Sequence, residues 1–146
     1  MLFPLEYYDI VEENAKKCGV SPLLIEAIIK AESGFNKEAT SAKNARGLMQ
    51  ILDGTAEWAA GEMGIENFDI ERIYEPELNI KIGTWYFAGF LLPKYKNDVE
   101  PALAAYNAGQ NNVDKWEKGE IRFPETKMYV EKVQLYYKIY KALYKE

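Results

Sequence analysis

Histidine is absent from this sequence, and cysteine occurs once, as Cys18. The lack of histidine excludes catalysis by a serine or cysteine nucleophile paired with histidine, and it removes the commonest zinc ligand. A single cysteine cannot form a disulfide within the chain. The groups left for chemistry are carboxylates, hydroxyls, amides and aromatic rings, including those of 11 tyrosines. We therefore predict a domain that works without a metal ion and without a cofactor.

Excess positive charge and long apolar runs are also lacking. The 18 Lys and Arg residues are outnumbered by 23 Asp and Glu residues, which gives a formal net charge of −5. This balance argues against nucleic-acid binding, because that function needs a basic surface. No run is typical of a signal peptide or a membrane-spanning helix, so we expect no membrane contact by this domain. The 146 residues fit one compact domain, 1–146, which we expect to be a monomer.

Helix start and stop signals recur along the whole chain, and no segment alternates as a β-strand. Ser21 followed by Pro22 is typical of a helix start, and Gly34 is typical of a helix end. We predict an all-α fold with little or no sheet, a compact bundle of about seven to nine helices around a substrate cleft. The expected helices cover residues 5–17, 22–33, 47–52, 56–63, 77–92, 99–107, 111–116 and a long segment from 124, with loops at 35–46 and 64–76.

One carboxylate stands where the pattern of the second helix calls for an apolar side chain. Ile25, Ile28 and Ile29 form an apolar stripe at helical spacing, and Glu32 is the next member of that series. Burial among isoleucines disfavours the charged form of a carboxyl, so we predict a raised pKa, as a general acid near neutral pH requires. Glu26 lies off the stripe, and we expect it to be solvated. Taken alone, the stripe favours a plainer interpretation, in which Glu32 ends the helix in solvent and has no function.

Four groups of residues along the chain, one of them containing Glu32, favour a functional role for this carboxylate. They are Glu32-Ser33, Ser41 with the run Ala-Arg-Gly-Leu-Met-Gln at 45–50 and Thr-Ala at 55–56, Ala-Tyr-Asn-Ala-Gly at 105–109, and Glu-Thr-Lys-Met-Tyr-Val at 125–130. In this order and spacing the chain resembles the lytic transglycosylase domain of the soluble, goose-lysozyme-like type, over about residues 7–140. It departs from the family pattern at Asn44, Asp53 and Lys127, where glycine, proline and arginine are common.

The resemblance implies a lysozyme-like fold and a reaction on peptidoglycan glycan strands. The bond implied is the β-1,4 bond between N-acetylmuramic acid and N-acetylglucosamine, cleaved without water. Glu32 would protonate the leaving oxygen and then take the proton from the muramoyl C6 hydroxyl, which closes a 1,6-anhydro ring. Because the nucleophile belongs to the same sugar, no protein nucleophile and no second carboxylate is needed.

The resemblance also implies substrate-binding roles for eight side chains: Ser33, Ser41, Met49, Gln50, Tyr106, Asn107, Glu125 and Tyr129. Each has a plainer interpretation as a structural residue, and for Met49 a place in the core is as good an interpretation as an apolar wall of the cleft. Trp116 lies near the Tyr-Asn pair, and it is interpreted as a core residue or as a platform for a sugar.

Three other functions remain open from the sequence. The first is a lysozyme-type hydrolase of the same bond, the second is an inactive module that binds peptidoglycan, and the third is a wall-opening part of a larger assembly. In each case we expect the protein outside the cytoplasm, at the cell wall or in the periplasm, with an export or anchor segment cut away from this chain.

Overall fold

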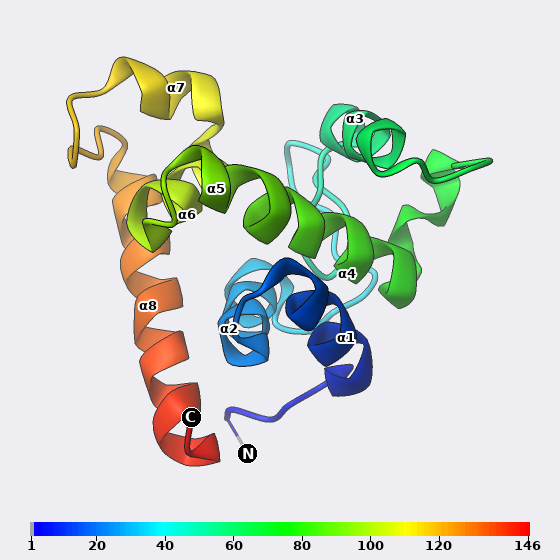
Figure 1. Cartoon of the computed structure of the whole chain (residues 1–146), viewed down its shortest axis with the longest axis horizontal. Coiled ribbons are helices and arrows are strands. Elements are labelled where there is room, and N and C mark those ends of the chain that lie inside the picture. Colours follow the sequence, from blue (N-terminus) through cyan, green and yellow to red (C-terminus); the bar gives the residue numbers. More distant parts are fainter. Residues whose placement is uncertain (1) are drawn as a thin grey trace.

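A computed structural model describes residues 2–146, and in them eight α-helices form one bundle (Figure 1). The α-helices are α1 (Tyr8–Cys18), α2 (Pro22–Ser33), α3 (Asp53–Met63), α4 (Pro76–Thr84), α5 (Leu92–Lys94), α6 (Val99–Ala108), α7 (Gln110–Lys115) and α8 (Pro124–Tyr144). A 3-10 helix, η1 (Ile70–Tyr74), and a π-helix, η2 (Trp85–Leu91), complete the set. The described residues contain isolated β-bridges but no sheet, which confirms the prediction of a helical fold.

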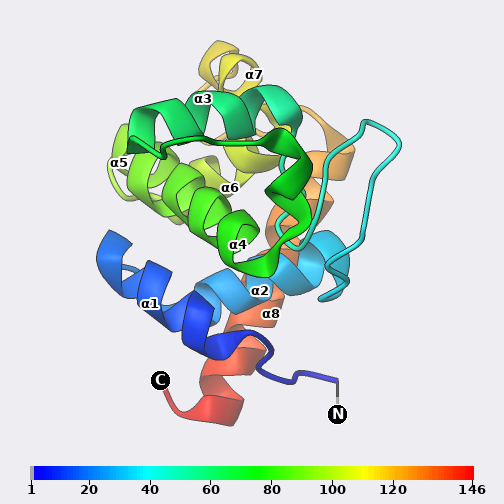
Figure 2. The same ribbon diagram turned by 90° about the vertical axis from the view of Figure 1, so that its right-hand side faces the viewer.

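Helix α2 has the bounds that the sequence predicts, and it lies at the centre of the bundle, packed against α1 and α8 (Figures 1 and 2). The hydroxyl of Ser21 accepts a hydrogen bond from the backbone N–H of Leu23, and Pro22 occupies the first turn. Every residue from 23 to 29 is buried. The prediction that Glu26 is solvated is therefore wrong, because a central helix is covered on more than one face.

The expected helix at 77–92 is longer in the structure and includes a π-helical segment. Helices α4, η2 and α5 follow one another without a break from Pro76 to Lys94 (Figure 1). In η2 the backbone bonds span five residues, as in the bond from the Leu92 N–H to the Phe87 carbonyl. The sequence predicts an end at residue 92, before Pro93, but the helix continues through Pro93 to Lys94, two residues further.

A short helix expected at 47–52 is instead a tight turn, so this prediction is wrong. Gly47 and Gln50 both have left-handed backbones, with φ of 80° and 51°, which an α-helix does not admit. Single antiparallel bridges from Arg46 to Thr40 and to Ile51 close the turn. The turn therefore leaves its backbone groups free to bond with other elements.

The remaining boundaries differ from the prediction by a few residues. Tyr7 has a left-handed φ of 54°, so α1 begins later than expected. Helix α3 begins at Asp53, three residues before the expected start. The loop expected at 64–76 contains η1, whose cap is the Asp69 side chain. The Asp98 side chain caps α6 by accepting a hydrogen bond from the Glu100 N–H.

Candidate active site

Glu32 lies in the last turn of α2, where the central helix reaches the surface. The isoleucines of the same stripe are fully buried, whereas Glu32 is partly accessible. Gly34 ends the helix with a φ of 60°, and its N–H bonds to the Lys30 carbonyl. The carboxyl therefore stands at the boundary between the core and an open surface, as a group that reacts with a ligand must.

The protein raises the pKa of Glu32 to about 7. Burial is the main cause, while a hydrogen bond from the Tyr129 hydroxyl and the positive charge of Lys132 act in the opposite direction. No second carboxylate among residues 2–146 contributes to this shift. The group thus exchanges its proton near neutral pH, and it does so without help from another acid.

Two tyrosines from different helices flank the Glu32 carboxyl. Tyr106 of α6 donates its hydroxyl proton to the Met49 backbone carbonyl, at 2.6 Å. The hydroxyl of Tyr129, on α8, is buried and has no hydrogen-bond partner other than Glu32 among the described residues. Burial, and then the charge of Glu32, raises the pKa of both phenols well above its usual value. Both are neutral near pH 7, and Tyr129 is the one free to donate to the acid.

Asn107 connects the two helices that carry these tyrosines. Its side-chain oxygen accepts a hydrogen bond of 2.8 Å from the hydroxyl of Thr126, a buried residue of α8. Asn107 follows Tyr106 directly, and Thr126 lies one turn before Tyr129. This bond therefore fixes the spacing of the two phenols around the acid.

Ser33, Ser41 and Gln50 all make hydrogen bonds that build the loop before α3. The Ser33 hydroxyl donates to the Leu48 carbonyl at 2.8 Å, the Gln50 amide nitrogen donates to the Gly47 carbonyl at 2.9 Å, and the Ser41 hydroxyl accepts from the Ala45 N–H at 3.0 Å. Ser33 and Gln50 are half-buried, and Ser41 is exposed. The sequence grouped these residues with Glu32, and the structure joins Ser33 directly to the loop.

Met49 and Glu125 occupy opposite environments. Met49 is fully buried, and the hydroxyl of Thr84 points to its sulfur at 3.8 Å. Of the two interpretations that the sequence left open for Met49, this burial favours the core residue over the apolar wall, and the Met49 carbonyl accepts the hydrogen bond from Tyr106. Glu125 is exposed in the first turn of α8.

Asn79 is a residue that the sequence analysis missed. It is fully buried in α4, and its side chain makes hydrogen bonds to the backbone at the turn 47–50. Its oxygen accepts from the Met49 N–H at 2.8 Å, and its nitrogen donates to the carbonyls of Arg46 and Ile73 at 3.0 and 2.9 Å. A Cβ on Gly47 would collide with the Asn79 side chain, so glycine is required there for contact as well as for backbone. An asparagine within an apolar helix is the signal that could have revealed it.

The acidic residues nearest to Gln50 in the sequence do not act as partners of Glu32. Asp53 makes an ion pair with Arg46 at 3.0 Å, and Glu57 is exposed on α3. Within residues 2–146, no three Asp, Glu or Cys side chains are grouped so that they could hold a metal ion. No helix in the described part of the chain is long and apolar enough to span a membrane.

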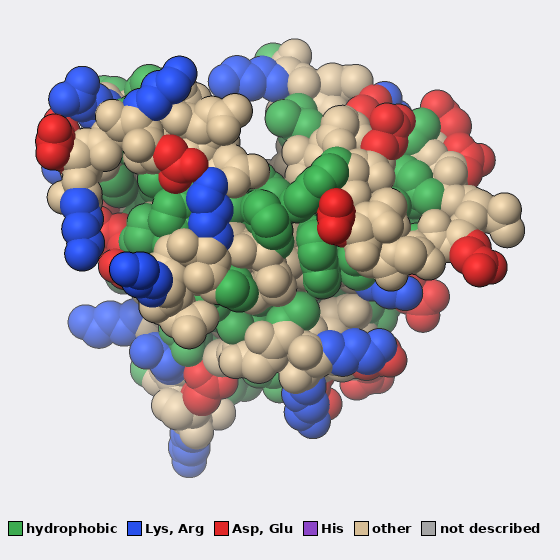
Figure 3. Space-filling model, turned by 45° about the horizontal axis from the view of Figure 1, so that its top comes forward, with side chains coloured by type: hydrophobic (Ala, Val, Ile, Leu, Met, Phe, Trp, Pro, Cys, Tyr) green, Lys and Arg blue, Asp and Glu red, His purple; other side chains and the backbone are tan. Residues whose placement is uncertain are grey.

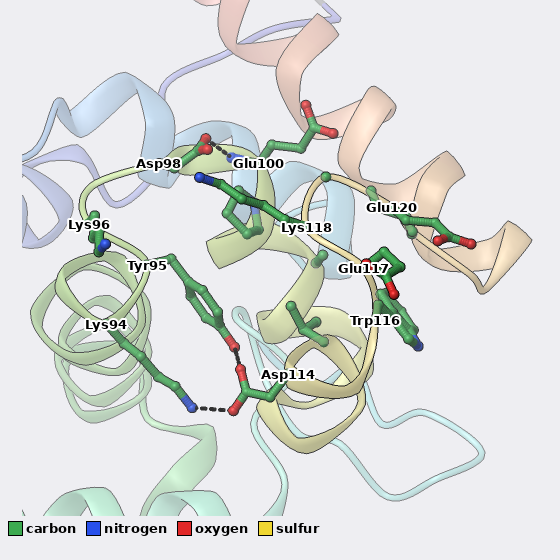
Figure 4. Close-up of a pocket in the computed structure, with 15 residues that line it drawn as sticks. Lys94, Tyr95, Lys96, Asp98, Glu100, Asp114, Trp116, Glu117, Lys118 and Glu120 are labelled. Carbon is green, nitrogen blue, oxygen red and sulfur yellow. Dashed lines mark hydrogen bonds and ion pairs between the residues drawn. The ribbon is translucent and has the colours of Figure 1, made fainter.

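A cavity of about 500 Å³ lies apart from Glu32, between α5, α6, α7 and the segment before α8 (Figure 4). In it the Lys94 ammonium pairs with Asp114 at 2.7 Å, and the Tyr95 hydroxyl donates to the same carboxylate at 2.8 Å. Trp116 lines this cavity and meets Phe123 edge to face, with the ring centroids 5.0 Å apart. Trp116 is therefore not a neighbour of the acid.

The fold and the site together define a class. A helical domain with a partly accessible carboxylic acid whose pKa is raised to about 7 is built like the enzymes that cleave glycosidic bonds by acid catalysis, of which lysozyme is the best-known case. The sequence profile described as "Transglycosylase SLT domain" matches residues 9–129. The chain belongs to this family.

Similar proteins agree with this assignment. The soluble lytic murein transglycosylase of Salmonella typhimurium is 33% identical over 92% of this chain, and a putative one of Haemophilus influenzae is 34% identical over 94%. Among solved structures, the Escherichia coli soluble lytic transglycosylase matches with a TM-score of 0.90 and 31% identity over 97% of the chain. A structure of the 70-kDa enzyme with bulgecin A matches with a TM-score of 0.92, 30% identity and 99% coverage.

The chain spans only about a quarter of the length of these proteins: 23% and 25% of the two sequences and 25% of each of the two structures. Similarity over this one domain therefore does not by itself transfer the activity, substrates or partners of the longer proteins to this chain.

Proposed function

We propose that this domain is a peptidoglycan lytic transglycosylase and that Glu32 is its single acid and base. The bond that it cleaves is the β-1,4 bond between N-acetylmuramic acid and N-acetylglucosamine in glycan strands outside the cytoplasm. The observation that carries the proposal is an enclosed carboxyl whose pKa is about 7, with no second carboxylate acting on it among the described residues. Names of relatives support the same substrate class.

The reaction needs two proton transfers, and one carboxyl performs both. Protonated Glu32 gives its proton to the glycosidic oxygen, the bond from that oxygen to C1 breaks, and N-acetylglucosamine leaves. The Glu32 carboxylate then removes the proton from the C6 hydroxyl of the muramoyl residue, while the C6 oxygen bonds to C1. The carboxyl ends protonated, as it began, and the product is a 1,6-anhydro sugar formed without water.

The surrounding groups have separate tasks in this proposal. Tyr129 donates a hydrogen bond to Glu32 in its charged form, between the two transfers. Tyr106 and Asn107 hold the walls of the site at a fixed spacing through Met49 and Thr126. We further propose that the polar groups of Ser33, Ser41 and Gln50 bind the acetamido groups or sugars and that Glu125 meets the amine of a peptide stem.

Mass spectrometry of digested peptidoglycan tests the proposal. Wild-type protein should release muropeptides with anhydro ends, and Glu32→Gln should lower the rate of release by roughly 10²–10⁴-fold, the usual contribution of a general acid or base. The matched control is Glu57→Gln, which removes an exposed carboxylate of α3 and should keep the wild-type rate. A melting temperature of Glu32→Gln at least equal to that of wild type shows that the loss is chemical.

The other outcomes separate the alternatives. Mainly reducing ends, heavier by one water than anhydro ends, would identify a lysozyme-type hydrolase and refute the transglycosylase proposal. If Glu32→Gln degraded the polymer as fast as wild type, the assigned acid would be wrong. If neither protein cleaved but both bound insoluble peptidoglycan, the domain would be a binding module.

A further inference from the structure

Four aromatic side chains gather between α3 and η2, and we call them the aromatic shelf: Trp58, Trp85, Tyr86 and Phe90. Trp58 comes from α3, and the other three come from the π-helical segment. Trp58 is 39% exposed, whereas its three neighbours are half-buried. The indole of Trp58 is thus exposed to solvent and packs on three half-buried rings. The proposed bond cleavage does not explain this exposure.

The rings of the shelf hold Trp58 in one place. Its centroid lies 4.7 Å from that of Phe90 with the planes at 75°, and 5.6 Å from that of Trp85. Trp85 and Phe90 are themselves stacked, with centroids 6.1 Å apart and planes at 26°. Edge-to-face and stacked ring contacts of this kind stabilise a ring pair beyond the burial of its area, so the indole is held in place before any ligand binds.

The π-helix explains why the three rings share one face. Its backbone bonds run from residue i to residue i+5, so side chains five positions apart, such as Trp85 and Phe90, come to lie together. Gly89 makes room beside them, because a Cβ there would come within 2.9 Å of the Trp85 ring. Single π-helical turns occur often at functional sites, which is consistent with a role for this face.

The shelf continues into the candidate active site. The Tyr86 centroid lies 6.2 Å from that of Trp58 and 5.7 Å from that of Tyr106, whose pKa responds to the charge of Glu32. Figure 3 shows hydrophobic side chains gathered across the middle of this face, beside a notch between the α7 side and the α3 side. The row from Tyr106 through Tyr86 to Trp58 therefore leads from the acid outward.

We propose that the aromatic shelf is a sugar-binding subsite, and that Trp58 stacks on a pyranose ring of the glycan strand away from the bond that is cleaved. This inference rests on the proposed function, since it assigns the occupant from the substrate of that site. The flat C–H face of a β-linked N-acetylhexosamine fits an open indole, and such contact needs no charge. Trp58 would thereby make the enzyme prefer long strands over short ones.

Binding measurements in the Glu32→Gln background test this separately from cleavage. The ligands are the β-1,4-linked tetramer and dimer of N-acetylglucosamine, and the measurement is isothermal titration calorimetry. We expect Trp58→Ala to raise the Kd of the tetramer about tenfold, which corresponds to ~1.4 kcal/mol, and to leave that of the dimer unchanged. Trp58→Tyr should recover most of the loss, because it restores an aromatic face.

The matched control is Trp116→Ala, which removes a tryptophan from the separate cavity and should alter neither Kd. Equal Kd values of the tetramer for Trp58→Ala and its parent would overturn the proposal, and so would a tetramer that binds no more tightly than the dimer. A hydrolytic product in the digestion above would refute the transglycosylase and leave the sugar-binding shelf standing. Loss of tetramer binding only in Trp58→Ala supports the shelf whatever the product is.

Discussion

At the scale of single residues, the candidate site depends on how neighbouring groups offset part of the rise in pKa that burial causes at Glu32. Glu32 loses hydration at the end of an apolar stripe, and Tyr129 and Lys132 recover part of the stability of its charged form. Both effects are needed for acid and base catalysis near neutral pH. Burial alone would keep the carboxyl protonated, and an exposed carboxyl would already have lost its proton. Removal of the Tyr129 hydroxyl should change the pKa of Glu32 directly, since this hydroxyl has no other partner in residues 2–146.

Replacement of Tyr129 by phenylalanine should shift the pH dependence of the reaction. The lost hydrogen bond had favoured the carboxylate, so the pKa of Glu32 rises further above 7. Because the first step requires the protonated acid, the limb of kcat/KM that falls with rising pH should move to higher pH. A pH–rate profile measures this, and Tyr137→Phe, which alters a half-buried phenol bonded to Glu146, serves as control. An unmoved limb would remove Tyr129 from the acid's environment.

At the scale of elements, the loop before α3 is shaped by a helix that follows it by some 30 residues. Asn79 of α4 bonds to Arg46, just before the 47–50 turn, and to Met49 within it, and through that turn it positions Gln50 and the Met49 carbonyl. The turn is closed by the backbone bonds between Arg46 and Ile51, and the bonds from Asn79 tie it to α4. The spacing of Ser33 and Tyr106 around Glu32 is therefore under the control of a side chain that touches none of them.

Asn79→Ala should destabilise the fold by roughly 2–4 kcal/mol, since it removes the partner of the buried Met49 N–H, deletes the bonds from the amide to the Arg46 and Ile73 carbonyls, and opens a gap in the core. The loss is measured as the free energy of unfolding in urea. Asn111→Ala, on the exposed face of α7, is the control and should change it little. If Asn79→Ala unfolded at the wild-type urea concentration, water must replace the amide, and the turn would not depend on it.

The sequence predicts those elements whose signals are local. Ser21, Pro22 and Gly34 bound α2 correctly because caps and turns act within a few residues, and the stripe identifies Glu32 for the same reason. The turn at 47–50 is mispredicted because its cause lies in α4. Glu26 is mispredicted because a stripe describes one buried face, whereas α2 is covered by both α1 and α8. The aromatic shelf escapes prediction because helical spacing gives no sign of a π-helix.

At the scale of the whole molecule, two carboxyls resist ionisation, the fully buried Glu26 and the partly accessible Glu32. Burial raises the pKa of Glu26 to about 8, and the nearby backbone of Glu6 acts in the opposite direction. The carboxyl oxygens of Glu26 have no hydrogen-bond partner of ordinary geometry among the described residues. Like Glu32, this group binds its proton more tightly in the folded protein than in the unfolded chain, where its pKa is 4.5.

The stability of the protein should therefore depend on pH. A carboxyl with a raised folded-state pKa contributes stability that is fully present below 4.5 and is lost as pH rises toward 8. We expect the melting temperature to fall by several degrees between pH 5 and pH 9. Glu26→Gln should flatten this decline more than Glu32→Gln does, and calorimetry at a series of pH values measures both. A decline of the same size in Glu26→Gln would mean that Glu26 has an ordinary pKa.

The bond between the Tyr106 hydroxyl and the Met49 carbonyl joins α6 to the turn before α3, two parts of the chain 57 positions apart. This bond crosses the site, so the turn that carries Gln50 and the helix that carries Tyr106 keep a fixed separation. The order that a sugar would otherwise impose on them is already set when the chain folds. Under the proposed function, a glycan strand would bind between walls that are already in place, and its binding energy would not be spent on ordering them.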